Sequence, residues 1–195
     1  MNKKSKILLL IASLTLVGTF FFPIWQIELI APQYPDGINM YIWINQITGD
    51  TDYTLQNVNI LNHYVGMQYI VPDSIPELKY FPYVIISWMV LGILLSLGKI
   101  KHGALIWGIS LSILGVLGMY DFYLWMYDYG HNLSDTAPIK VPGMSYMPPL
   151  FGTKWLLNFK ATSLPHYGTM FLTISILLSL FAALLNFKFM NKNKK

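Results

Sequence analysis

The stretch GALIWGISLSILGVLGMYDFYLW, residues 103–125, has 23 residues and a single charged side chain, that of Asp121. As an α-helix it would be about 34 Å long, which is enough to cross a hydrocarbon layer of about 30 Å. Residues 7–25, 80–97 and 168–187 are apolar stretches of similar length. The sequence therefore predicts an all-α membrane protein, a four-transmembrane-helix bundle.

The amino-acid composition agrees with a membrane protein and excludes several kinds of site. Of the 195 residues, 54% are hydrophobic and 11% are charged, whereas soluble domains contain about 25% charged residues. The absence of cysteine excludes disulfides, thiolate metal sites and cysteine nucleophiles. All 13 basic residues are lysines, so no guanidinium group is present for bidentate phosphate contacts, and we expect no nucleic-acid partner.

The distribution of lysine predicts the orientation in the membrane. Nine lysines and no acidic residue lie in segments 1–6, 98–102 and 188–195, on one side of the predicted spans. The positive-inside rule places this side, with both termini, in the cytoplasm. Residues 26–79 and 126–167 then form two long extracytoplasmic loops. We expect these loops to form a small cap, because unstructured loops of this length are unusual.

Short elements are predicted within both loops. Residues 40–47 alternate well enough for a strand, residues 48–52 (TGDTD) predict a turn, and residues 54–69 predict a short helix. In that helix His63 and Met67 would share one face, four positions apart. Four prolines and two glycines between residues 137 and 154 exclude a regular helix there and predict turns and extended chain.

Histidine and methionine gather on the predicted outer side, where they suggest a metal site. Imidazole and thioether groups together suit copper, in particular Cu(I). The candidate ligands are His63, Met67, His131, Met144 and Met147. The alternative is structural, with methionines that fill gaps in a small core and histidines that bond to backbone groups.

Two carboxylates near the outer end of residues 103–125 are candidate functional groups. Asp121 is the only acid within a predicted span, and acids in this position are costly and usually functional. Trp125 and Asp128 follow it by four and seven positions, so an unbroken helix would place all three on one stripe. A structural role for Asp121 at the membrane interface remains the alternative.

Small residues predict which spans pack together. Residues at four-residue spacing allow two helix backbones to approach closely in lipid. Such residues occur within 103–125 and within 168–187, at Ala104, Gly108, Ser112, Ser175, Ser179 and Ala183. We therefore expect the third and fourth spans to pack tightly.

Several stretches resemble a known family. They are APQYPDGINMYI (31–42), NILNHYVGM (59–67), PDSIPEL (72–78) and the long run from DFYLWMYDYG to KWLLNF (121–159). In these stretches and in the order of its spans, the chain is similar to small membrane proteins of clade II nitrous-oxide reductase gene clusters, the NosB-like proteins. The resemblance implies a bacterial inner-membrane protein that supports the maturation of, or the electron supply to, a periplasmic copper enzyme. It supplies no catalytic motif.

Three functional hypotheses follow. In the first, an accessory protein in the lipid bilayer supports a periplasmic copper enzyme, of the nitrous-oxide reductase type, through transient Cu(I) binding in its cap. In the second, the protein is a scaffold or a quinol-linked electron-transfer anchor that docks a periplasmic or membrane partner, and Asp121 and the aromatic residues line a quinol pocket. In the third it is a small transporter component. No GxSxG, HExxH or phosphate-loop motif is present, so we do not expect an enzyme.

Overall fold

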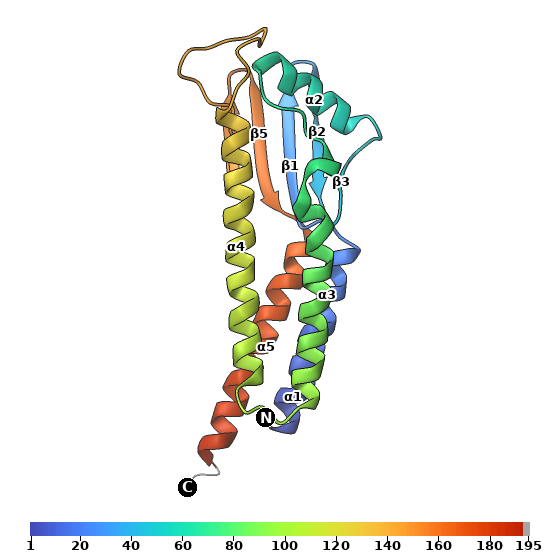
Figure 1. The fold of residues 1–195 in the computed structure, drawn as a ribbon, viewed down its shortest axis with the longest axis vertical. Helices are drawn as coiled ribbons and strands as arrows, with labels where there is room; N and C mark the ends of the chain where they lie inside the picture. Colours follow the sequence, from blue (N-terminus) through green and yellow to red (C-terminus); the bar gives the residue numbers. More distant parts are fainter. Residues whose placement is uncertain (193–195) are drawn as a thin grey trace.

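The computed structural model describes residues 1–192 and shows a helical bundle with a β-sheet at one end (Figure 1). The structure contains five α-helices and a five-stranded antiparallel sheet; 57% of the residues are helical, short 3₁₀ helices included, and 16% are in strands. The prediction of an all-α four-helix bundle was therefore wrong. The sheet is formed by the segments that were expected to be loops. We call the sheet, together with the short helix that covers it, the cap.

The long helices are α3 (Pro76–Leu97), α4 (Gly103–His131) and α5 (Tyr167–Lys192). Within the described residues, these three are long and apolar enough to cross a membrane. They contain the predicted spans 80–97, 103–125 and 168–187, and each extends beyond the predicted bounds. The helix α4 runs without a break to His131, so its last turns stand beside the sheet (Figure 1).

The first predicted span, residues 7–25, is divided in the structure. It consists of α1 (Lys3–Thr15) and a 3₁₀ helix, η1 (Leu16–Phe20), and Trp25 already begins the first strand. The helix tightens where Gly18 lies against the ring of Phe171, since a Cβ atom at Gly18 would be 2.3 Å from that ring. Pro23 follows and cannot continue a helix. This segment is therefore shorter as an α-helix than its hydropathy indicates.

The sheet has the strand order β3-β2-β1-β5-β4. Its strands are β1 (Trp25–Ala31), β2 (Tyr34–Ile42), β3 (Ile47–Gly49), β4 (Gly152–Leu156) and β5 (Phe159–Pro165). The pairing of β1 with β5 joins the two segments that sequence reasoning treated as separate loops. The predicted strand at 40–47 is thus the end of β2, a turn, and the start of β3.

Alternation along the strands gives the sheet one buried and one open face. In β1, Trp25, Ile27 and Ala31 are buried, whereas Gln26 and Glu28 between them are only partly buried. The buried face packs against α2 (Thr54–Val65) and the outer part of α4, in a core that includes Ile38, Met40, Val58, Ile70 and Tyr129. The cap thus has a hydrophobic core of its own.

The helix α2 is shorter than predicted and ends before Met67. Gly66 follows Val65 with a φ of 82°, a left-handed conformation that favours glycine and ends helices. His63 lies in the last turn of the helix, while Met67 lies beyond its end. The expectation that these two side chains share one helical face was therefore wrong.

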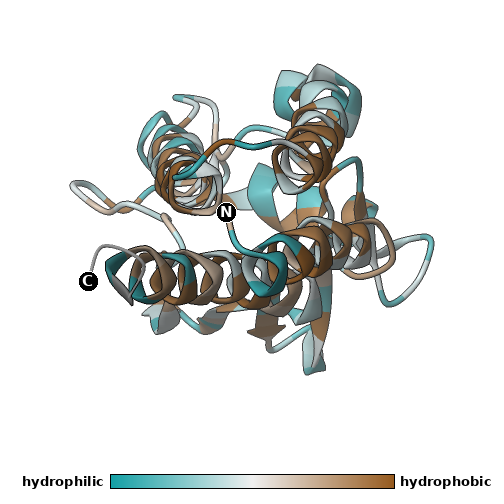
Figure 2. Cartoon of the chain, turned by 90° about the horizontal axis from the view of Figure 1, so that it is seen from below, coloured by the Kyte–Doolittle hydropathy of each residue, from teal (hydrophilic) through white to brown (hydrophobic). Residues whose placement is uncertain are grey.

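The helices pack in pairs that leave α3 and α4 apart. The helices α1 and α5 form a layer, α3 packs mainly on α1, and α4 packs mainly on α5 (Figure 2). Gly108 of α4 meets Ser179 of α5 so closely that a Cβ atom at Gly108 would lie 2.2 Å from the Ser179 hydroxyl. This confirms the predicted packing of the third and fourth spans. The helices α3 and α4 are joined by the turn 98–102 and have few contacts beyond it.

The N-terminus, the 98–102 turn and the last turns of α5 meet at the end away from the sheet (Figure 1). Asn186 Nδ2 donates to the Lys101 carbonyl (2.6 Å), the Asn2 backbone N–H donates to Asn186 Oδ1 (3.0 Å), and Lys6 Nζ donates to the Leu97 carbonyl (3.1 Å). The three lysine-bearing segments, as far as the structure describes them, are therefore on one side of the molecule. Lys194 and Lys195 lie outside the described residues.

Candidate functional site

A large cavity lies between α3, α4 and α5, below the base of the sheet. Its volume is about 690 Å³, within the range of about 300–1,000 Å³ typical of small-molecule sites. We call it the chamber. Its roof is formed by residues at the ends of β1, β2 and β3, among them Trp25, Ile42, Trp43 and Ile47. The chamber exists because α3 and α4 pack on different partners and diverge from their common turn.

The chamber is long, apolar and open on one side. Its wall on α4 runs from Leu111 to Trp125, a distance of about 21 Å at the rise of an α-helix. Most lining residues are aliphatic or aromatic. Val116 and Leu124 line the chamber and are themselves 69% and 45% exposed. A hydrocarbon chain in the surrounding lipid could therefore enter from the side of α4.

The inner end of the chamber is closed by packed side chains. Ile85 and Leu111 belong both to its wall and to the core of the bundle. Below them that core is continuous through Leu9, Ala12 and Trp107, each 0% exposed. The chamber thus occupies only the half of the bundle that is nearer to the sheet.

Two carboxylates line the outer end of the chamber. Asp121 comes from α4, as the sequence suggested, and Glu77 comes from the first turn of α3. Trp125, one turn beyond Asp121, also lines the chamber, whereas Asp128 does not. Both carboxylates of α4 are exposed. The predicted stripe on α4 is therefore correct for Asp121 and Trp125. Sequence reasoning missed Glu77, because nothing local places the start of α3 opposite Asp121.

Aromatic rings continue from the chamber into the cap. Phe122 meets Trp25 edge to face (5.8 Å between centroids) and stacks on Trp125 (6.4 Å). Trp125 stacks on Tyr129 at 4.3 Å, and the Tyr129 hydroxyl donates to the Tyr69 carbonyl. Stacked rings of this kind bury large areas with a fixed geometry. The chamber roof and the core of the cap are therefore one connected structure.

The predicted metal ligands are distributed over several parts of the cap and the end of α4. The His63 ring is exposed and stacks on Tyr69 (6.3 Å), while the exposed His131 ring stacks on Tyr127 (4.0 Å), with Nδ1 2.9 Å from the Tyr127 carbonyl oxygen. Met67 and Met144 pack against one hydrophobic cluster of the cap. The structure thus packs two of the methionines against the same cluster and gives each histidine an aromatic partner of its own.

Met147, the fifth candidate ligand, lies against the end of α4. A Cβ atom at Gly130 would be 2.3 Å from the Met147 backbone, so only glycine permits this approach. Over residues 1–192, no three histidine, aspartate or glutamate side chains gather as metal ligands.

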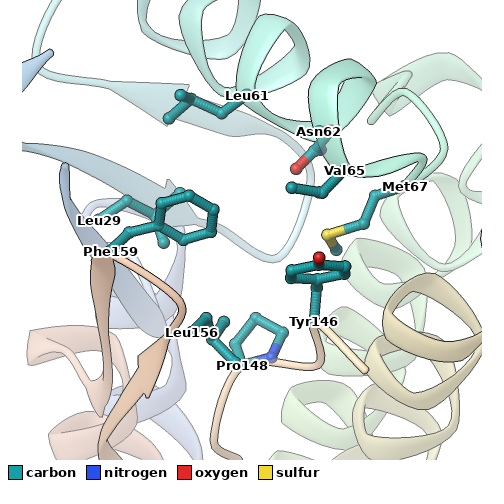
Figure 3. Close-up of a pocket in the computed structure, with 9 residues that line it drawn as sticks. All are labelled: Leu29, Leu61, Asn62, Val65, Met67, Tyr146, Pro148, Leu156 and Phe159. Atoms are coloured by element: carbon teal, nitrogen blue, oxygen red, sulfur yellow. The ribbon is translucent and has the colours of Figure 1, made fainter. Parts of the chain in front are cut away.

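A second, much smaller cavity lies inside the cap, between α2 and the segment after α4 (Figure 3). Its volume is about 40 Å³, and its lining includes Asn62, Met67 and Tyr146. Tyr146 is 1% exposed, and its hydroxyl has no hydrogen-bond partner in the part of the chain that the structure describes. The space is sufficient for a water molecule, which would satisfy that hydroxyl.

The open face of the sheet carries a polar network centred on Asp50. Its carboxylate accepts hydrogen bonds from the backbone and side chain of Asn39 (3.0 and 2.9 Å) and from the Tyr41 hydroxyl (3.0 Å). Burial and then the hydrogen bond to Asp50 raise the pKa of Tyr41. Burial acts to raise the pKa of Asp50, but the hydrogen bonds from Asn39 and Tyr41 outweigh it and the pKa is lowered. The network stabilises the edge of β2 where β3 ends.

Comparison with known proteins adds no assignment: the sequence matches no protein-family model and no curated protein. On geometric grounds, the chamber is the strongest functional candidate. It combines a large cavity, an apolar wall and two carboxylates at one end.

Proposed function

We propose that this protein is a membrane-embedded accessory protein that binds a quinone-type lipid in the chamber and docks a redox partner through its cap. A single observation carries the proposal. The chamber is an apolar cavity of about 690 Å³ with aromatic and acidic groups at its outer end only. A molecule with a flat polar ring and a long hydrocarbon tail has the same division between its two ends.

The shape of the chamber suits such a ligand. Phe81, Phe122 and Trp125 are at the outer end, where they can contact a ring. The aliphatic part of the α4 wall, from Leu111 to Met119, continues for about 12 Å, which accommodates the first part of an isoprenoid tail. The open side next to Val116 allows the ligand to exchange with lipid. We do not extend the proposal to transport, because packed side chains fill the inner half of the bundle.

The orientation in the membrane forms part of the proposal. The lysine-bearing ends of α1, α3 and α5 lie together, and the cap lies at the opposite end. This supports a cytoplasmic location for both termini in a bacterial inner membrane and an extracytoplasmic location for the cap. The ring of the ligand would then lie near the outer surface, directly below the cap. A partner outside the cytoplasm could approach it there.

The proposal is tested by filling the chamber. A Cβ atom at Gly115 would meet no other atom within 4 Å, although Gly115 lines the chamber. A Gly115→Phe variant should therefore fold normally and place its ring in the cavity. The matched control is Ile113→Phe on α4, because Ile113 is 55% exposed and does not line the chamber.

The measurement is calorimetric titration of the detergent-purified protein with a benzoquinone and the corresponding hydroquinone, each with a ten-carbon tail. We expect micromolar or tighter binding of at least one form, weakened about tenfold or more by Gly115→Phe and unchanged by Ile113→Phe. If neither form binds, or if both variants bind as the wild type does, the proposal is wrong.

A second candidate function, Cu(I) handling for an extracytoplasmic enzyme of the nitrous-oxide reductase type, is favoured by one observation. Met67 and Met144 come from distant parts of the sequence and pack against the same cluster. Two thioether groups in the same part of the cap suit Cu(I). The alternative is that these methionines only fill the core of the cap.

A further inference from the structure

The polar groups around the chamber differ in whether they are already engaged. Its hydroxyl groups all donate within the protein: Ser112 to the Gly108 carbonyl (2.8 Å), Thr173 to the Thr169 carbonyl (2.9 Å), and Thr169 to the Ile24 carbonyl. A hydroxyl that donates to a carbonyl has no proton left to offer to a ligand. The serine and threonine side chains therefore contribute no free donor.

The indole groups are engaged in the same way, with one exception. Trp25 Nε1 donates to Ser163 Oγ (2.7 Å), and Trp43 Nε1 donates to Thr48 Oγ1 (2.8 Å). Within residues 1–192, Trp125 is the one lining side chain that carries an N–H group with no hydrogen-bond acceptor. No lysine or histidine lines the chamber. The free donors of the chamber are thus reduced to a single indole.

The acceptors, in contrast, are free. In the part of the chain that the structure describes, neither Glu77 nor Asp121 accepts a hydrogen bond from a side chain or forms an ion pair with a lysine. On the same helix as Glu77, Pro82 has no N–H to donate to the Leu78 carbonyl, so this carbonyl lacks its usual helical partner. The outer end of the chamber therefore presents two carboxylates.

The shortage of free donors and the presence of free acceptors determine which head group of a bound lipid fits the chamber. A quinone ring carries two carbonyl oxygens and can only accept hydrogen bonds, whereas the hydroquinone carries two hydroxyls and can donate two. Polar groups that remain unpaired in an apolar site cost binding free energy. An anionic head group, such as a phosphate, would face two carboxylates and no cation. We propose that the chamber selects the reduced, hydroquinone form of its ligand, with the ring hydroxyls donating to Asp121 and Glu77.

This inference rests on the proposed function and is tested with the same two ligands, titrated under anaerobic conditions. In the wild type, we expect the hydroquinone to bind at least about tenfold more tightly than the quinone, as expected when one charged hydrogen bond is made or lost. In Asp121→Asn and Glu77→Gln an amide can donate to a quinone carbonyl, so the preference should shrink or reverse. Asp52→Asn, a change of the same kind on the cap surface, should leave the preference unchanged.

The outcomes separate the two proposals. Equal affinities for both forms, each weakened by Gly115→Phe, would overturn the redox preference and leave ligand binding in the chamber intact. A preference that persists in both carboxylate variants would overturn the assigned role of Asp121 and Glu77. If an alkylammonium ion with the same tail displaces the hydroquinone and binds more tightly, the chamber is a site for lipophilic cations and the inference is wrong. Absence of any binding overturns the proposed function itself.

Discussion

The ring of Phe81 on α3 reaches across to Gly118 on α4, where a Cβ atom would lie 3.3 Å from the tip of the ring. Both residues line the chamber. The two helices are joined at the other end by the turn 98–102, so this contact spans the space between them near the sheet. The chamber is therefore held open by the helix packing below it and bridged by one aromatic ring near its outer end.

The packing of α4 predicts opposite effects for two glycines on the same helix. Gly108→Ala would place a methyl group 2.2 Å from the Ser179 hydroxyl, and we expect a destabilisation of about 1–3 kcal/mol from overpacking. Gly115→Ala meets no atom within 4 Å and should leave stability unchanged or raise it by up to about 1 kcal/mol, the difference in helix propensity. Thermal unfolding in detergent measures both. Equal losses would contradict the assigned α4–α5 interface.

The buried Tyr146 hydroxyl predicts a neutral or stabilising substitution. Because this hydroxyl has no partner among the described residues, Tyr146→Phe removes an unsatisfied polar group and keeps the ring that packs against Val65 and Leu156. The unfolding temperature should therefore stay the same or rise. Tyr146→Leu is the control for the ring and should lower it. A marked loss in Tyr146→Phe would reveal a hydrogen bond of this hydroxyl with a bound water or ligand.

The Asp50 network predicts a loss of stability in acid. Because the pKa of Asp50 in the folded protein is lowered, its contribution to stability is fully present above its unfolded pKa of about 3.9. That contribution is lost as the pH falls through the lower, folded value. We expect Asp50→Asn to be less stable than the wild type at pH 6, with a difference that shrinks below about pH 4. A difference independent of pH would show that the charge of Asp50 contributes nothing.

The copper hypothesis makes a prediction about two methionines, Met67 and Met144, which pack against the same cluster of the cap. If Cu(I) binds in the cap, competition with a chromophoric chelator should show sub-micromolar affinity that falls about tenfold or more in Met67→Leu and in Met144→Leu. Leucine retains much of the packing volume at both positions. The control is Met170→Leu, because Met170 is 56% exposed on α5. Absence of binding, or equal binding by all variants, would leave these methionines as core residues.

Sequence reasoning was most successful for α3, α4 and α5, because a long apolar run is a local signal. It also placed Asp121 and Trp125 on one stripe of α4, which the chamber confirms. The alternation Trp25, Ile27, Leu29, Ala31 was available as the signal of β1. It directly follows the first apolar stretch, so Trp25 was assigned to the end of that span and residues 26–31 to a loop.

The sheet and the chamber depend on contacts that no local pattern encodes. Glu28 of β1 pairs with Thr162 of β5, far away in the sequence, so the cap exists only once both segments have met. The convergence of Glu77 and Asp121 likewise follows from the divergence of α3 and α4. That divergence results from the separate partners of the two helices, α1 and α5.

The most direct test of the central claim is photolabelling with an azido-substituted quinone in membranes that contain the protein, followed by peptide mapping. The account predicts labels on residues 111–125 of α4 and 77–85 of α3, with a strong decrease in Gly115→Phe and none in Ile113→Phe. Labels spread over the exposed surfaces of the helices, such as residues 90–97 of α3, and insensitive to Gly115→Phe, would show that the chamber does not bind this class of lipid.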